Sequence, residues 1–114
     1  MPSPSKAKGN RFEREVVKIV KESGLDAKRA WGSNGAALGM HEEVDVLIMD
    51  SFKVQAKVRK KIASFLIPSE HVDSVICKQD RGEPLIIMRL EDWLKMAVLY
   101  KKGDKWKDYL KLVT

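Results

Sequence analysis

The sequence predicts an α/β fold in which helices flank a central mixed β-sheet. Two segments near the ends of the chain carry apolar residues at helical spacing, and two segments in the middle alternate apolar and polar residues as strands do. A chain of 114 residues, 44% of them hydrophobic, is long enough for one domain with a modest core. The expected order is helix, three strands, helix, strand, helix, which is typical of this class.

The first helix is expected over residues 11–23, where the apolar side chains follow a helical period. Asn10 suits the N-cap position, and Gly24 follows the last turn, as a C-terminal glycine commonly does. Residues 1–9 are rich in Pro, Ser and Lys, so we expect them to form a flexible basic arm. After the helix, a short strand is expected over 26–31.

A Gly- and Ala-rich loop over residues 32–41 leads to two further strands, at about 43–49 and 52–58. In both strands, apolar residues occupy every even-numbered position. In an antiparallel pair these residues therefore lie on the same face only if the two residue numbers of each opposed pair add up to an even number. The compact solution has a three-residue loop and opposes Val46 with Val54.

The second half of the chain is expected to begin with a helix over residues 69–79. Residues 85–88 are apolar and follow a proline, which predicts a short buried strand. A last helix is expected over 91–101, where an apolar stripe recurs. The domain would then span residues 10–101, with 102–114 as a basic tail that docks on it or contacts a partner.

The charge of the chain favours a polyanionic partner. Lys and Arg number 22 against 16 Asp and Glu, and the first 61 residues hold 13 of the basic and 8 of the acidic residues. Cys77 is the only cysteine, so neither a disulfide nor a cysteine-based zinc site is expected. No apolar run is long enough to span a bilayer, and we expect a soluble cytoplasmic protein of cellular or viral origin.

The hairpin register places Asp45 directly opposite Gln55, with Lys57 beside them on the same face. Carboxylate and amide oxygens can ligate Mg²⁺, which completes its shell with water and phosphate. A lysine beside the metal can orient the attacking water or stabilise the charge that develops on the phosphate. These three residues indicate metal-dependent phosphodiester cleavage and a small DNA nuclease. In the alternative explanation, Asp45 is only a strand-end residue paired with Lys57.

Glu13 is a fourth candidate, because it shares a stripe of the first helix with Val16 and Val20 and borders the buried face. Spacing alone favours an exposed acid in the first helical turn, stabilised by the helix dipole. Basic residues that extend from the candidate site, or lie in the N-terminal arm, are expected to contact phosphates without reading sequence. They are Arg59, Lys60 and Lys61 beside the site and Lys8 in the arm.

Several segments form a combined motif over about residues 8–60: Lys8-Gly9-Asn10-Arg11-Phe12-Glu13-Arg14-Glu15, Gly24, Arg29-Ala30-Trp31-Gly32-Ser33, Val44-Asp45-Val46 and Val54-Gln55-Ala56-Lys57. This combination resembles the signature of archaeal-type Holliday junction resolvases, which belong to the PD-(D/E)XK nuclease superfamily. The resemblance implies a restriction-endonuclease-like core, a homodimer, and dependence on Mg²⁺, with Mn²⁺ as a possible substitute. It also implies paired nicks in branched double-stranded DNA during recombination and repair.

The resemblance also assigns roles by position. It places the metal-site positions at Glu13, Asp45 and Gln55, and the motif lysine at Lys57. Positions used for the site and the DNA backbone fall at Arg14, Arg29 and Ser33.

Two features depart from the family pattern. Gln55 stands where a glutamate is usual, which removes a negative charge and is expected to weaken metal affinity, with Glu42 or Glu43 as possible compensation. The 32–43 connection also looks longer than in the archaeal enzymes, so roles within it are not carried over.

Three alternatives stay open. The first is another PD-(D/E)XK nuclease of replication or recombination, which nicks duplexes or trims ends. The second is a relative that binds DNA but has lost its chemistry through Gln55. The third is a basic adaptor for protein or RNA, in which Asp45 and Lys57 form an internal ion pair.

Overall fold

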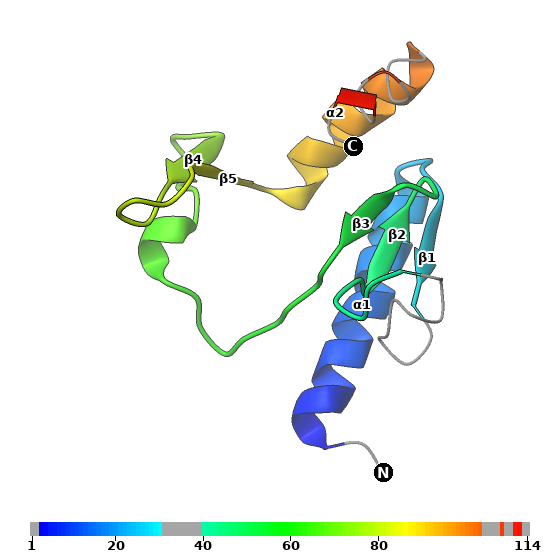
Figure 1. Ribbon diagram of the computed structural model, residues 1–114, viewed down its shortest axis with the longest axis horizontal. Helices are drawn as coiled ribbons and strands as arrows, with labels where there is room; N and C mark the ends of the chain where they lie inside the picture. Colours follow the sequence, from blue (N-terminus) through cyan, green and yellow to red (C-terminus); the bar gives the residue numbers. More distant parts are fainter. Residues whose placement is uncertain (1–2, 31–39, 104–107, 109–110, 113–114) are drawn as a thin grey trace.

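The computed structural model describes residues 3–30, 40–103, 108 and 111–112. Within these residues there are two helices and five strands, and the α/β class is as predicted (Figure 1). In chain order the elements are α1 (Pro4–Glu22), β1 (Ala27–Arg29), β2 (Val46–Ile48), β3 (Phe52–Val54), the 3₁₀ turn η3 (Ser64–Leu66), β4 (Ser74–Cys77), β5 (Leu85–Met88) and α2 (Leu90–Lys102).

The start of α1 differs from the prediction, because the helix begins at Pro4 and includes most of the expected arm. Ser3 is the N-cap, and its hydroxyl accepts a hydrogen bond of 3.2 Å from the Lys6 N–H. A proline at the start of a helix loses no hydrogen bond and already has a helical φ. The prediction of Asn10 as N-cap was therefore wrong.

The end of α1 is as predicted. Gly24 has a φ of 96°, a left-handed conformation that favours glycine. Its N–H donates to the Lys21 carbonyl at 3.0 Å, and the Leu25 N–H donates to the Val20 carbonyl at 3.3 Å. These two bonds form a Schellman motif, which satisfies carbonyls at the end of the helix and turns the chain toward β1.

Strands β1, β2 and β3 form an antiparallel sheet in this order. The predicted register of the central hairpin is confirmed where the ladder is regular, with Val46 opposite Val54 and Ile48 opposite Phe52. Both strands are shorter than predicted. At this end of the hairpin, the Asp45 N–H donates to the Val54 carbonyl, and the Asp45 carboxylate accepts the Ala56 N–H.

The predicted central mixed sheet is not present among the described residues. Strands β4 and β5 form a second, separate antiparallel sheet, with Ser74 opposite Met88, and an extended segment separates it from β1–β3 (Figure 1). The predicted helix over 69–79 was wrong, because its β-branched and apolar residues pair with β5 as a strand. The strand at 85–88 has the predicted bounds, but it is not buried.

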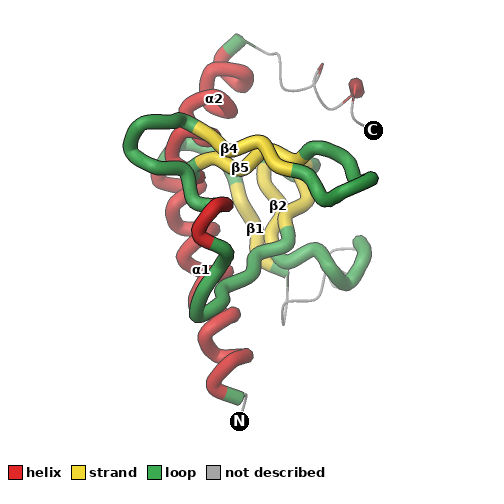
Figure 2. Tube along the Cα trace, turned by 90° about the vertical axis from the view of Figure 1, so that its left-hand side faces the viewer, coloured by secondary structure: helices red, strands yellow, loops and turns green. Residues whose placement is uncertain are grey.

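The core lies between the two helices and the β1–β3 sheet. Helix α1 packs along β1 and β2 (Figure 2), and α2 adds its predicted apolar stripe to the same cluster. No helix in the described ranges is long and apolar enough to cross a membrane. The buried core consists of Val16, Val20, Leu25, Ala27, Val46, Ile48, Leu94 and Ala97.

Candidate active site

Glu13 is buried on the face of α1 that packs against the sheet, with a side chain only 5% exposed. Its Oε1 accepts a hydrogen bond of 2.9 Å from Nε of Arg29, at the end of β1. Arg29 also donates from Nη2 to Oδ1 of Asn10, at 2.8 Å. A buried carboxylate needs such a partner, and a guanidinium can serve two acceptors at once. Glu13 is therefore not the exposed acid that its spacing alone favoured.

Asp45 is buried just before β2, between Val44 and Val46. Its carbonyl accepts the Ala30 N–H at 2.8 Å, so its backbone is fixed on the β1 side. Its carboxylate is fixed on the other side, because the Ala56 N–H donates to Oδ2 at 2.9 Å. The position of this carboxylate is set by backbone groups of two neighbouring strand segments.

The hairpin ladder shifts at Asp45. Its N–H donates to the carbonyl of Val54 at 2.9 Å, one residue short of the partner that the regular register would give. Val54 thus faces both Val46, its partner in the ladder, and Asp45, so two residues of one strand face one residue of the other, as in a β-bulge. Asp45 and Gln55 are consequently not the directly opposed pair that was predicted. Gln55 follows the end of β3 and is exposed.

Burial, one backbone N–H and three charged side chains shift the pKa of Asp45. Burial is the main cause that raises the pKa of Asp45 above its ordinary value, and the negative charge of Glu13 adds to it. The Ala56 N–H and the positive charges of Lys57 and Arg29 act in the opposite direction. Lys57 influences Asp45 in this way, although these two described residues form no ion pair.

A basic hollow of about 600 Å³ opens beside Asp45. It brings together one acid and four basic side chains, from the start of α1 and from the segment after β3. A smaller hollow of about 440 Å³ continues along residues 57–67 and includes Lys61. The basic hollow is lined by Ser5, Lys8, Gly9, Asp45, Ala56, Lys57, Val58, Arg59 and Lys60.

The predicted site residues are thus only partly gathered. Five of them line the hollow, namely Asp45, Lys57, Lys8, Arg59 and Lys60. Neither Glu13 nor Gln55 lines it. Arg14 is exposed on α1, and Ser33 lies outside the described residues.

Asn10 was missed as a site residue. It was interpreted as a cap, but it stands one helical turn before Glu13 on the same face, and this spacing could have indicated a shared partner. The hollow-lining residues Ser5 and Gly9 were missed because residues 1–9 were expected to lie outside the domain.

Among the described residues, no group of three or more His, Cys, Asp or Glu side chains is placed to hold a metal ion. Asp45 has the hard oxygen donors that Mg²⁺ prefers, and water and phosphate oxygens commonly fill most of its shell. The oxygen donors of Asp45 would fit Mg²⁺ as one part of a shell that water and phosphate complete.

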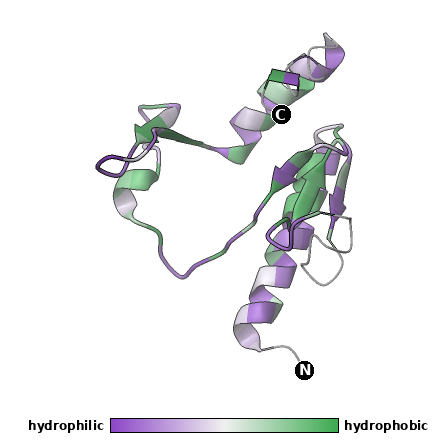
Figure 3. Cartoon of the chain, viewed as in Figure 1, coloured by the Kyte–Doolittle hydropathy of each residue, from purple (hydrophilic) through white to green (hydrophobic). Residues whose placement is uncertain are grey.

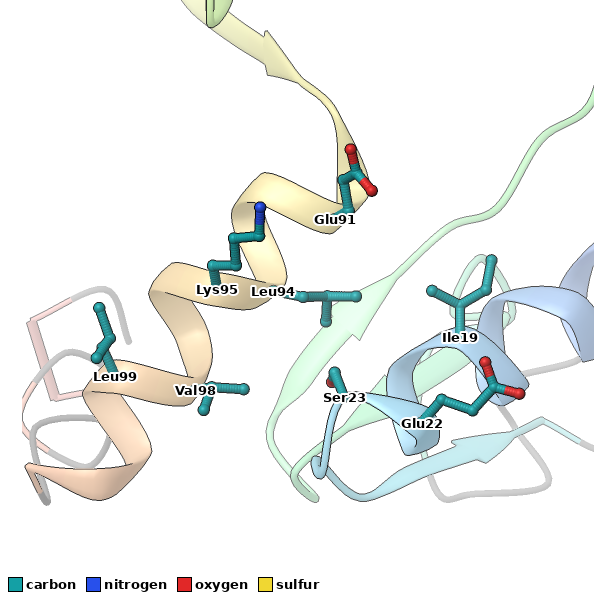
Figure 4. Close-up of a pocket in the computed structure, with 8 residues that line it drawn as sticks. All are labelled: Ile19, Glu22, Ser23, Glu91, Leu94, Lys95, Val98 and Leu99. Atoms are coloured by element: carbon teal, nitrogen blue, oxygen red, sulfur yellow. The ribbon is translucent and has the colours of Figure 1, made fainter.

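A second groove, of about 610 Å³, lies between the C-terminal end of α1 and α2 (Figure 4). Half of its eight lining residues are apolar, among them Ile19, Leu94 and Val98. Its charged residues are Glu22, Glu91 and Lys95. It shares no residue with the basic hollow, so we do not place the chemistry there.

The site combines a buried acid and a nearby lysine with a hollow whose positive charge suits a phosphate backbone. Residues 4–106 match the family described as archaeal Holliday junction resolvase (Hjc), and the chain belongs to this family. The resemblance seen in the sequence is confirmed, and nuclease activity of the Holliday junction resolvase type follows in general. Comparison with curated proteins and with solved structures gave no match.

Proposed function

We propose that the protein is a Mg²⁺-dependent endodeoxyribonuclease that resolves four-way DNA junctions by paired nicks. The observation that supports this most is Asp45, a buried carboxylate at the wall of a hollow that is otherwise basic. Structural acids are rarely buried without an ion-pair partner, whereas acids that bind a metal need to be kept accessible on one side. The family membership supports junction DNA as the substrate.

Asp45, Gln55 and Glu13 are the residues that would hold the metal. When bound, Mg²⁺ would polarise the phosphate and lower the pKa of the attacking water. The Ala56 N–H orients the Asp45 carboxylate through Oδ2. Lys57, in the same hollow, stabilises negative charge that develops on the phosphate.

The remaining basic residues bind the DNA backbone. Lys8, Arg59 and Lys60 line the hollow, and Lys61 extends it. Contacts to phosphate fix the position of DNA without reading its sequence, which suits an enzyme that recognises branch shape. Arg29, which binds Glu13 and Asn10, acts as a positioning residue rather than as a phosphate ligand. We also propose that Arg14 and Ser33 contact the DNA backbone.

The test is cleavage of an immobile four-way junction beside a linear duplex of the same sequence, with Mg²⁺ and with chelator. Paired nicks near the branch point that chelator abolishes are the expected result. Equal cutting of both substrates would assign the chain to a general nuclease. Tight binding without cleavage would identify a DNA-binding relative that has been disabled through Gln55.

Gln55→Glu is expected to lower the Mg²⁺ concentration for half-maximal cleavage by roughly tenfold, because a carboxylate attracts a dication more strongly than an amide. Titration of cleavage against Mg²⁺ measures this. Gln79→Glu is the control, since it makes the same change at an exposed position. An unchanged Mg²⁺ requirement would remove Gln55 from the metal site.

We also propose a homodimer formed through the β4–β5 hairpin. A two-stranded hairpin is marginally stable alone, and this one is apolar along both strands (Figure 3). The opposed pair Ile76 and Ile86 is 70% and 62% exposed, and Leu85 is 56% exposed. Exposed apolar patches of this kind mark interaction sites, and a two-fold axis would hold two active sites at a fixed spacing for paired nicks.

Ile86→Glu is therefore expected to shift the protein from dimer to monomer, because it would bury a charge in the apolar interface. Light scattering measures the mass, and the junction assay should then show single instead of paired nicks. Lys78→Glu, at an exposed position just after β4, is the control for altered charge. Wild-type protein that is already monomeric would contradict the proposed dimer.

A further inference from the structure

Gly9 lies inside α1, where a glycine is unfavourable. It has no left-handed φ, since Gly24 is the only described glycine with a positive one. Glycine in the interior of a helix is less stable than alanine, because its backbone loses more conformational freedom on folding. The helix therefore gives no conformational reason for a glycine at this position.

Packing within the protein gives no reason either. A Cβ atom built at Gly9 would have no heavy atom of a described residue within 4 Å. By contrast, a Cβ at Gly82 would approach the carbonyl oxygen of Gln79 to 3.1 Å. Alanine would fit at Gly9 without displacing any described part of the chain.

The open space at Gly9 belongs to the basic hollow. Gly9 lies on the same stripe of α1 as Ser5 and Glu13, because residues four apart stack on one face of a helix. At Glu13 this stripe is buried against the sheet. The N-terminal part of α1 extends past the strands (Figure 1), and Ser5 and Gly9 line the hollow that contains Asp45 and Lys57.

The hollow also has the charge of a phosphate site. Its lining carries four positive charges, from Lys8, Lys57, Arg59 and Lys60, and one negative charge, from Asp45. Ser5 and Gly9 are the small residues of the α1 wall, so this wall leaves its backbone accessible to a ligand.

We propose that Gly9 lacks a side chain so that a DNA strand can lie against the backbone of α1, with a phosphate group held beside Lys8 and Lys57. This inference rests on the proposed nuclease function and adds a position that determines how closely the strand approaches Asp45. Gly9 contributes by leaving space, so enlarging its side chain excludes the strand without removing a charge.

The test compares Gly9→Ala and Gly9→Leu with the wild-type protein. Gly9→Ala should raise the midpoint of thermal unfolding by about 3 °C, because the helix becomes more stable. The same change should weaken junction binding in chelator by roughly tenfold, and Gly9→Leu by roughly a hundredfold. Cleavage in Mg²⁺ should fall in the same order.

Ala7→Gly is the matched control, since Ala7 lies in the same helix but does not line the hollow. It should lower the unfolding midpoint and leave junction affinity unchanged. Wild-type affinity in both Gly9 variants would overturn this inference and leave the proposed function standing. A wild-type protein that binds no DNA would overturn the proposed function as well.

Discussion

Asp45→Asn is expected to abolish Mg²⁺-dependent cleavage and, in the absence of metal, to make the protein more stable. Loss of residues that only support a metal ligand costs roughly 10–100-fold in activity, so loss of the ligand itself should cost at least about a hundredfold. The gain in stability has a separate cause. Burial raises the pKa of Asp45, which means that the ionised carboxylate destabilises the folded chain.

The direction of the pH dependence follows from this raised pKa. The folded chain holds the Asp45 proton more tightly than the unfolded chain, so the wild-type fold gains stability as the pH falls through the raised pKa. That contribution is lost as the pH rises. The stability advantage of Asp45→Asn should therefore be largest at neutral pH and should shrink toward acid pH.

Thermal unfolding in chelator, followed from neutral pH down to about pH 4, near the ordinary pKa of an aspartate, measures this advantage. Asp80→Asn, in the exposed turn between β4 and β5, is the control and should show no such trend. A variant that unfolds at a lower temperature than wild type at neutral pH would show that the Asp45 carboxylate stabilises the fold. The interpretation of Asp45 as a destabilising functional acid would then be wrong.

The sequence predicts those parts of the fold that depend on neighbouring residues. Alternation of apolar residues was sufficient to set the register between Val46 and Val54, because a shift by one residue would expose the apolar face. Gly24 was sufficient to locate the end of α1, because its position requires a left-handed φ. The start of α1 was missed because a Pro-, Ser- and Lys-rich segment resembles a disordered arm until Ser3 and Pro4 are recognised as a helix start.

Pairing between distant segments is harder to predict. Residues 74–77 could form a helix or a strand by composition, and the outcome depends on β5, on the other side of a turn. The site shows the same limit. Asp45 and Lys57 were identified from one hairpin, whereas Arg29 meets Glu13 and Asn10 across 16 and 19 residues of sequence. Only the packing of α1 on β1 brings these three side chains together.

The charges of the site explain why Arg29 matters. Burial is the main cause of the raised pKa of Asp45, repulsion from Glu13 adds to it, and the positive charges of Lys57 and Arg29 act against it. Of the two cations, Arg29 is the one that contacts a buried acid directly.

Arg29→Met is accordingly expected to destabilise the fold by about 3 kcal/mol, because it leaves Glu13 buried without its guanidinium partner. Chemical denaturation measures this free energy of unfolding. Lys28→Ala is a close control, since the adjacent Lys28 pairs with Asp50 at the same distance of 2.9 Å, but with side chains 55% and 66% exposed. An exposed pair contributes little, so this control should change stability much less.

The double variant Glu13→Leu/Arg29→Met separates the ion pair from simple packing. Replacing both partners of a buried pair by apolar residues is often neutral, so most of the stability lost in Arg29→Met should return. Junction cleavage should not return, because the restored fold lacks both Glu13 and its positioning partner. If the double variant is as unstable as Arg29→Met, then Arg29 stabilises the fold through its contact with Asn10 or through packing, and not by compensating the charge of Glu13.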